Sequence, residues 1–254
     1  MAEKRSPELA HWIQEHVSFP GTMVDRIVPA ATEESLAEIA HELGVADPCA
    51  ISCEPFIQWV IEDNFVCGRP QWESAGVQMV ENVLPWEQMK LRMLNGSHSF
   101  LAYLGYLAGF QHISDCMQDS AFREAAYRLM LTEQAPTLQI IDVDLNQYAL
   151  SLLDRFANPA LKHKTWQIAM DGSQKLPQRM LEGIRVHLAR QSEWPLLALG
   201  IAGWMRYVSG VDDSGATIDI RDPLSEKIAA LVAQSTESER VSALLSLHEI
   251  FSAD

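Results

Sequence analysis

The segment from residue 85 to 98, PWEQMKLRMLNGSH, carries four side chains whose types and spacing could do chemistry. On a helix that turns by about 100° per residue, Glu87, Asn95 and His98 all lie within about 140° of Lys90. The same arc carries apolar and small residues, namely Leu91, Leu94, Leu101, Ala102, Gly105 and Gly109. We therefore expect this face to pack against another part of the protein. Charged and polar side chains on such a face are costly unless they are paired or functional.

These four side chains have coherent chemical roles. Burial disfavours the ammonium form of a lysine and lowers its pKa, so Lys90 could act as a general base near neutral pH. Asn95 could donate an amide hydrogen to an oxygen that gains negative charge, and His98 could orient a hydroxyl group. Glu87, one turn before Lys90, could pass the abstracted proton to water. The spacing alone also fits an ordinary surface pair of Glu87 and Lys90, with Asn95 and Gly96 marking a helix irregularity.

A second polar segment, DGSQKLPQR at residues 171–179, is predicted to form a turn between helices that presents Lys175 and Arg179. Fixed donors position oxygen atoms well, so this turn could clamp an anionic or polyhydroxylated substrate. Plain helix capping is the alternative interpretation.

Other chemistries find no support in the motifs. The remaining histidines are scattered, and Cys49-x3-Cys53 is not the C-x2-C spacing of a zinc knuckle, so we expect no metal site. The chain has no G-x-S-x-G elbow for a nucleophilic serine. It also lacks G-x-G-x-x-G and the P-loop pattern, which predicts no cradle for nucleotide phosphates within it.

Helical periodicity dominates the chain. Thr32 can cap a helix that stops at Gly44, and Pro85 suits the first turn of a long helix to about residue 112. Further helices are expected at about 117–134, 144–156, 160–170, 176–190, 195–208, 222–234 and 236–252. Only residues 49–53 and 60–66 could form strands. No segment alternates strand, helix and strand, so the sequence does not predict a parallel sheet. The interpretation is one mostly α domain.

The composition excludes several classes of protein. The 254 residues are 48% hydrophobic and 21% charged, which is typical of a folded chain with a substantial core. A net charge of −15 repels phosphate backbones and anionic lipid, so we expect no nucleic acid and no membrane as partner. No apolar stretch reaches the ~20 residues of a bilayer helix, and the N-terminus does not look like a secretory signal. The four cysteines suggest reduced thiols in a cytoplasmic protein.

Residues 17–29, VSFPGTMVDRIVP, look like the signature of the mannitol dehydrogenase family, the polyol-specific long-chain dehydrogenases. CEPFIQWVIEDNF at 53–65 is similar to the family's next block, and Lys90, Asn95 and His98 match its catalytic Lys-x4-Asn-x2-His. RFANP at 155–159 and DGSQK at 171–175 continue the resemblance, which covers nearly the whole chain in the family's order.

The resemblance implies a fold. Members of the family pair an N-terminal Rossmann-type domain that binds NAD with a mostly helical C-terminal domain that completes the substrate site. The signature normally lies at the junction of the two domains, but here it begins only sixteen residues after Met1. The expectation is therefore a mostly α, multi-helix C-terminal domain over residues 1–254, without the Rossmann domain. Such a chain would be incomplete and inactive by itself.

The resemblance also implies roles for single residues. Lys90 matches the general acid/base that takes the hydroxyl proton during oxidation. Asn95 matches the residue that stabilises the developing alkoxide, and His98 the one that binds the reacting oxygen. Glu87 fits the position of a proton relay before the lysine.

Further implied contacts concern the substrate. Val24 and Asp25 of the signature would border the substrate beside the cofactor, and Lys175 would contact its far end. A second cation, Arg179, looks more like the sugar-acid branch of the family, because a neutral polyol needs no partner for a carboxylate. The favoured reaction interconverts D-mannonate and D-fructuronate, with mannitol and fructose next. It would use NAD and no metal.

Two hypotheses follow. In the first, the chain is the substrate-binding and catalytic half of an NAD-dependent oxidoreductase for a sugar acid or polyol. In the second, it is a truncated, non-catalytic helical module that forms a homodimer or docks on a nucleotide-binding partner.

Overall fold

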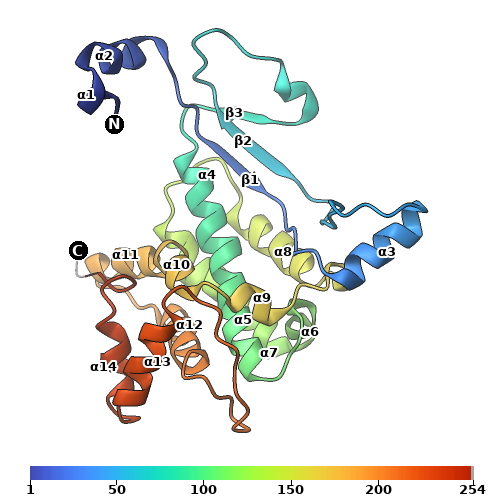
Figure 1. Cartoon of the computed structure of the whole chain (residues 1–254), viewed down its shortest axis with the longest axis vertical. Helices are drawn as coiled ribbons and strands as arrows, with labels where there is room; N and C mark the ends of the chain where they lie inside the picture. Colours follow the sequence, from blue (N-terminus) through green and yellow to red (C-terminus); the bar gives the residue numbers. More distant parts are fainter. Residues whose placement is uncertain (253–254) are drawn as a thin grey trace. The chain divides into compact units, whose positions relative to one another are not determined.

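The computed structural model describes residues 1–252, which divide into two compact units. The sheet unit comprises residues 1–27 and 53–88, and the helical unit comprises residues 28–52 and those from 89 onward. Figure 1 shows the elements of both. Within residues 1–252, no helix has the length and apolar character needed to cross a membrane.

The sheet unit is built on three short strands, β1 (Thr22–Asp25), β2 (Gln58–Glu62) and β3 (Gln78–Val80). β2 lies between the other two and pairs antiparallel with β1 and parallel with β3. Met23 on β1 is opposite Val60 on β2, and both belong to the buried core of the unit. The other elements are α1 (Ala2–Arg5), α2 (Pro7–His16), η1 (Trp72–Ala75) and α4 (Leu84–Met89), whose last residue belongs to the helical unit.

The parallel pair corrects the expectation that the sequence forms no parallel sheet. β2 confirms a strand near 60–66, although it begins and ends earlier, and residues 49–53 are not a strand. β3 has three residues, and the connection from β2 contains only the single turn η1. A βαβ unit has a crossover helix of several turns, so the pattern used to search for parallel strands could not detect this pair.

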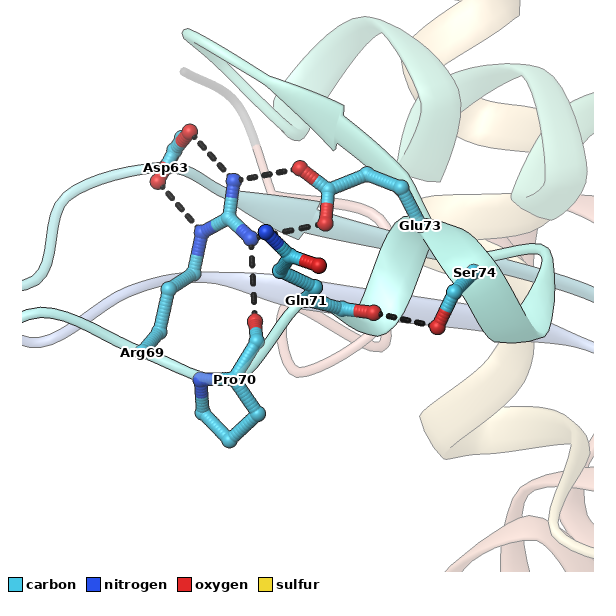
Figure 2. A network of polar contacts seen from close by, with 6 residues as sticks. All are labelled: Asp63, Arg69, Pro70, Gln71, Glu73 and Ser74. Carbon is cyan, nitrogen blue, oxygen red and sulfur yellow. Dashed lines mark hydrogen bonds and ion pairs between the residues drawn. The ribbon is translucent and has the colours of Figure 1, made fainter.

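An ion-pair network around Arg69 holds the connection between β2 and β3 (Figure 2). The Arg69 guanidinium donates two hydrogen bonds of 2.7 Å to Asp63 and two of 2.7 and 2.9 Å to Glu73. It also donates to the carbonyl oxygen of Pro70. These hydrogen bonds lower the pKa of both carboxyl groups and raise the pKa of Arg69. A guanidinium shared by two carboxylates closes the loop between residues 63 and 73.

The helical unit consists of short helices around a central one, α5 (Ser97–Leu107), which packs against α9 and α12 (Figure 1). Three of its segments, η2, η3 and η6, are π-helical, and η4 and η5 are single 3₁₀ turns. The remaining elements are α3 (Glu33–Leu43), η2 (Lys90–Gly96), α6 (Ile113–Gln118), α7 (Ser120–Arg128), η3 (Leu129–Gln134), η4 (Ala135–Thr137), α8 (Leu145–Phe156), η5 (Pro159–Leu161), α9 (Thr165–Ala169), α10 (Gly172–Leu176), η6 (Pro177–Leu181), α11 (Glu182–Arg190), α12 (Pro195–Tyr207), α13 (Ser225–Gln234) and α14 (Arg240–Leu245).

Local sequence signals set the ends of several expected helices. α3 begins after Thr32, whose side chain accepts a hydrogen bond from the Ser35 amide, and it stops at Gly44 in the left-handed conformation. The long helix expected from Pro85 to about residue 112 is instead three consecutive segments, α4, η2 and α5, and it ends at Leu107. The helices expected at 160–170 and 236–252 are reduced to α9 and α14. The mostly helical character of the chain is as expected.

Replacing Arg69 by alanine should loosen the connection between β2 and β3. The folded-state pKa values of Asp63 and Glu73 are lowered, so their contribution is present above the ordinary carboxyl pKa of about 4 and is lost as the pH falls through the folded-state values. We expect faster amide hydrogen exchange at Ser74 and Gly76 in Arg69→Ala at neutral pH. The difference from the unsubstituted protein should shrink as the solution is acidified below pH ~4.

Arg123→Ala is the control for this experiment. It removes one exposed ion pair with Asp154, and such pairs contribute little. Amide exchange at Ser74 and Gly76 should stay unchanged in this control. Unchanged protection in Arg69→Ala at neutral pH would show that the network does not hold the connection.

Candidate functional site

The π-helical segment η2 brings Lys90 and Asn95 to one face of the helix. A π-helix closes its hydrogen bonds between residues five apart, so positions 90 and 95 lie one above the other. In a regular α-helix the same two side chains would point about 140° apart. His98 follows in the first turn of α5 and is buried, whereas Lys90 and Asn95 are half-buried. The three side chains of the Lys-x4-Asn-x2-His motif are therefore partly or fully withdrawn from bulk water.

Gly96 ends the π turn at a point of close contact. A Cβ atom at this position would lie 2.4 Å from Nε2 of Gln134 and 2.7 Å from the carbonyl oxygen of Arg179. The Ser97 hydroxyl next to it donates to Oε1 of Gln134 at 3.3 Å. The segments η3 and η6 thus pack directly on η2 at the glycine. Oδ1 of Asn95 is buried and has no hydrogen-bond partner among residues 1–252.

The imidazole of His98 is held by ring contacts. It lies 4.3 Å from the ring of Phe156, tilted by 31°, and 5.3 Å from the ring of His163, nearly perpendicular to it. Burial lowers the pKa of His98 well below its ordinary value of 6.5, and the positive charges of Arg179 and Arg155, together with that of His163 when it is protonated, lower it further. His98 is therefore a neutral imidazole at neutral pH, with one donor and one acceptor nitrogen.

The segment 171–179 carries two further cations: Arg179 acts on both His98 and His163, and Lys175 acts on His163. Burial lowers the pKa of Arg179 to about 10. Burial also lowers the pKa of Lys175, and the positive charge of Arg179 lowers it further. The guanidinium of Arg179 donates to the Ser99 hydroxyl at 3.0 Å, while its Nε is buried without a partner in the described part of the chain. Lys175 donates to the carbonyl oxygens of Ile168 and Met170. We call Lys175, Arg179 and Arg155 the cationic cluster.

Close packing holds the start of α10, the helix that carries Lys175. Asp171 has a positive φ of 57°, and Gly172 follows it with no room for a side chain. A Cβ at Gly172 would lie 2.5 Å from Nε1 of Trp204 and 2.7 Å from the hydroxyl of Tyr103. The Ser173 amide donates to Asp222 at 2.8 Å. The segment is therefore the start of a helix packed against the core, and not only the turn between helices that the sequence predicted.

The arrangement of the helical unit suits a ligand that is both hydroxylated and anionic. A neutral imidazole, an amide and an amine can exchange hydrogen bonds with hydroxyl oxygens, and fixed guanidinium and ammonium groups can pair with a carboxylate. Buried polar atoms without protein partners are costly, and such atoms cluster at functional sites. Oδ1 of Asn95 and Nε of Arg179 are two such atoms.

Three expected site residues belong to the sheet unit. Asp25 is fully buried at the end of β1, Val24 beside it is 46% exposed, and Glu87 is exposed on α4. The alternation of Val24 and Asp25 follows from the pleat of the strand. Their proposed contacts with the substrate, and the relay role of Glu87, stay predictions.

Sequence reasoning missed several residues around His98. His163 was one of the scattered histidines, Ser99 and Gln134 belonged to no motif, and Phe156 was noted only as part of RFANP, with no role assigned to it. His163 stands between two lysines in the short segment KHK, and such alternation is a weak signal that the middle side chain turns inward. Among residues 1–252 there is no group of three or more His, Cys, Asp or Glu side chains that could hold a metal ion.

Comparisons with known families bear on this geometry. The family model described as the mannitol dehydrogenase C-terminal domain matches residues 82–254, and the one described as the mannitol dehydrogenase Rossmann domain matches residues 1–74. The chain belongs to the mannitol dehydrogenase family. The family membership that the sequence motifs predicted is therefore confirmed.

Two proteins of Escherichia coli are among the relatives of this chain. The "Uncharacterized oxidoreductase YeiQ" is 79% identical over 254 residues, which are 100% of this chain and 52% of that protein. The "D-mannonate oxidoreductase" is 60% identical over 255 residues, again 100% of this chain and 52% of that protein. The chain thus spans about half the length of these curated relatives. Among solved structures, Pseudomonas fluorescens mannitol 2-dehydrogenase in a ternary complex with NAD and D-mannitol has a TM-score of 0.88 and 39% identity, and the match covers 97% of this chain and 50% of that one.

The match of residues 1–74 corrects one expectation. The sequence was taken to lack the Rossmann domain and its NAD-binding part because the family signature begins at residue 17, and the missing glycine fingerprint agreed with that interpretation. The Rossmann-domain model nevertheless matches the stretch that contains β1 and β2. A fingerprint marks only the turn that holds the phosphates, so its absence could not exclude other parts of that domain. The expected incompleteness and inactivity of the chain gain no support from these matches.

A methyl group at Gly96 should disturb the π turn. Gly96→Ala places its Cβ against Gln134 and the backbone of Arg179, and such overpacking typically costs about 1–3 kcal/mol. We expect this loss in the free energy of unfolding, measured by urea denaturation. Gly183→Ala on α11 is the matched control, because its Cβ would make only ordinary van der Waals contacts, with Leu197 and Thr137. The control should be neutral or up to ~1 kcal/mol more stable. Equal stabilities of the two variants would argue against a tight contact at Gly96.

Proposed function

We propose that this chain supplies the substrate-binding and proton-transfer residues of an NAD-dependent oxidoreductase that interconverts a sugar acid or polyol and its keto form. The observation that carries the proposal is the neutral His98 imidazole, which lies on the helical run that carries Lys90 and Asn95 and next to the cationic cluster. The family of the chain supports the same reaction class.

A sugar acid is favoured over a neutral polyol as the substrate. Lys175 and Arg179 are partly buried cations, and their pKa values are lowered mainly because burial disfavours charge. A bound carboxylate would offset that cost, and an arginine can bind it through two parallel hydrogen bonds. The D-mannonate oxidoreductase among the relatives agrees with this choice. We therefore favour D-mannonate and D-fructuronate, with mannitol and fructose next.

The proposed proton path begins at Lys90. As a neutral amine it takes the proton of the reacting hydroxyl group during oxidation, and Glu87 passes that proton outward. Asn95 donates its amide hydrogen to the same oxygen as negative charge develops there, and neutral His98 donates its ring N–H. Val24 and Asp25 border the substrate, and Lys175 and Arg179 hold its far end.

The described residues do not offer a site for the pyrophosphate of NAD. They contain no glycine-rich turn, and α3, the helix that follows β1 in sequence, opens with Glu33 and Glu34, whose charges repel phosphate. No step of the proposal is routed through the cofactor. The roles assigned to this chain are binding, orientation and proton transfer.

Replacing Lys90 by methionine should remove the general base. We expect kcat for NAD-dependent oxidation of D-mannonate to fall by about 10²- to 10⁴-fold at neutral pH, with a smaller change in KM. The loss should narrow as the pH rises, because hydroxide can replace the missing base. Lys164→Met is the control, since Lys164 lines a different part of the helical unit. Unchanged turnover in Lys90→Met would end the general-base proposal.

Replacing Arg179 by methionine should weaken the binding of an anion more than that of a polyol. A hydrogen bond to a charged group contributes about 1.5–3 kcal/mol, so D-mannonate should bind ~10- to 100-fold more weakly in isothermal titration calorimetry. D-mannitol, which carries no carboxylate, should change by less than ~3-fold. Arg179→Lys keeps the charge without the planar guanidinium, so its affinity for D-mannonate should lie between those of the unsubstituted protein and Arg179→Met. An equal loss for both ligands would contradict a carboxylate contact at Arg179.

A further inference from the structure

The loop between α8 and α9 turns one histidine inward. It runs through η5 to Lys162, His163 and Lys164. Lys162 and Lys164 line a cavity of about 440 Å³ on the side of α3, and His163 does not. Its ring instead contacts the ring of His98, 5.3 Å away and nearly perpendicular. The loop therefore presents His163 to the candidate site.

The backbone on both sides of His163 is fixed. The Ile113 amide donates to the His163 carbonyl at 3.0 Å, and the Thr165 amide donates to the Gln111 carbonyl at 2.9 Å. His112 and Lys164 form an antiparallel bridge. These contacts tie the loop to the start of α6, so the position of the His163 ring does not depend on solvent-exposed contacts alone.

Ion pairs hold the turn that precedes His163. Lys162 has a positive φ of 46°, a conformation that is unfavourable for a residue with a side chain. Its ammonium group lies 2.6 Å from Glu38 and 3.6 Å from Glu34 on α3. These pairs hold the strained residue in place, and the chain after it is directed toward His98.

Burial, and to a smaller extent the cations nearby, keep His163 neutral. Burial lowers the pKa of His163 to about 4, and the positive charges of Lys175 on α10 and Arg179 on η6 contribute. His98 faces it from α5. On α6, His112 and Asp115 contact each other. Nδ1 of His163 is buried and has no hydrogen-bond partner within residues 1–252.

His98 depends on its ring neighbours for orientation. No hydrogen bond from another described residue fixes its imidazole, and Phe156 and His163 are the rings that contact it. A neutral imidazole has one donor and one acceptor nitrogen, so a rotated ring would present the wrong one to a substrate oxygen. The neighbouring rings therefore set the plane in which the two nitrogens of His98 lie.

We propose that His163 is a positioning residue for His98: its uncharged ring fixes the plane of the His98 imidazole and excludes water from it. The inference rests on the proposed function only for the claim that His98 contacts the substrate. Phe156 alone leaves the side of His98 that meets His163 open, and a smaller residue at 163 would admit water there.

The test compares three substitutions at position 163 in the full chain. His163→Phe keeps an uncharged ring of similar size, whereas His163→Ala and His163→Gln remove it. The titration of His98 is followed by NMR of its ring Cε1–H signal, which is assigned by its loss in His98→Gln. His112→Phe is the matched control, because His112 lies next to Lys164 across the bridge and lines the cavity on the side of α3.

We expect His98 not to titrate between pH 5.5 and 8 in the unsubstituted protein, in His163→Phe or in His112→Phe. In His163→Ala and His163→Gln, water reaches the ring and the pKa of His98 rises toward its ordinary value of 6.5, so the signal titrates. The acid limb of kcat/KM for D-mannonate should move to higher pH in the same two variants and be restored by phenylalanine. If the His163→Ala variant does not fold, the titration of His98 in His163→Gln tests the proposal.

Two results would overturn the proposal. One is a His98 signal that stays insensitive to pH in the alanine and glutamine variants. The other is a phenylalanine variant that behaves like alanine, because then the ring of residue 163 is not what matters. The NMR titration needs no turnover, so absence of D-mannonate oxidation in the unsubstituted protein would count against the proposed function alone.

Discussion

One widened helical turn, from Lys90 to Gly96, decides where the candidate chemistry lies. Hydrogen bonds between residues five apart place Lys90 and Asn95 on one face, and the return to α-helix at Ser97 places His98 one turn further on. The turn needs a residue without a side chain at position 96, because Gln134 and the Arg179 backbone occupy the space. The same close contact joins the helix that carries the motif to the segment that carries the cations.

The contact between η2 and η6 at Gly96 also places cations near the two histidines. Arg155, Lys175 and Arg179 stand close enough to His98 or His163 to lower their pKa values, and burial adds to the effect. Protonating either imidazole would add another positive charge to a partly buried group of cations. The site therefore combines permanent cations with neutral rings. A ligand carboxylate beside Arg179 would offset part of the cost of burying its charge.

Much of this could be predicted from the sequence where the signal is local. The cap at Thr32 and the glycine at 44 predicted the ends of α3, and the Lys-x4-Asn-x2-His spacing singled out three residues on one helical run whose roles stay predictions. The π turn was not predictable from a regular wheel of 100° per residue, although Asn95 and Gly96 had indicated an irregularity. His163 could not be identified because its neighbour, His98, lies 65 residues away in the chain. Strand β3 was missed because it has only three residues, and the Rossmann match to residues 1–74 was missed because the family signature at residue 17 was taken to mark the start of the C-terminal domain.

The three π segments explain why such distant residues meet. η2 packs on both η3 and η6, and each of these widened turns contributes a polar group to the junction. Arg179 in η6 turns its carbonyl toward Gly96, while Gln134 in η3 accepts the Ser97 hydroxyl. In η3 the buried carboxylate of Glu133 also accepts two backbone amides at the start of α12. Because a π turn has fewer helical hydrogen bonds for its length and a weaker intrinsic stability, three of them in contact imply that side-chain packing maintains them. Such turns often occur at functional sites, and here they bring the amine, the amide and the guanidinium into one unit.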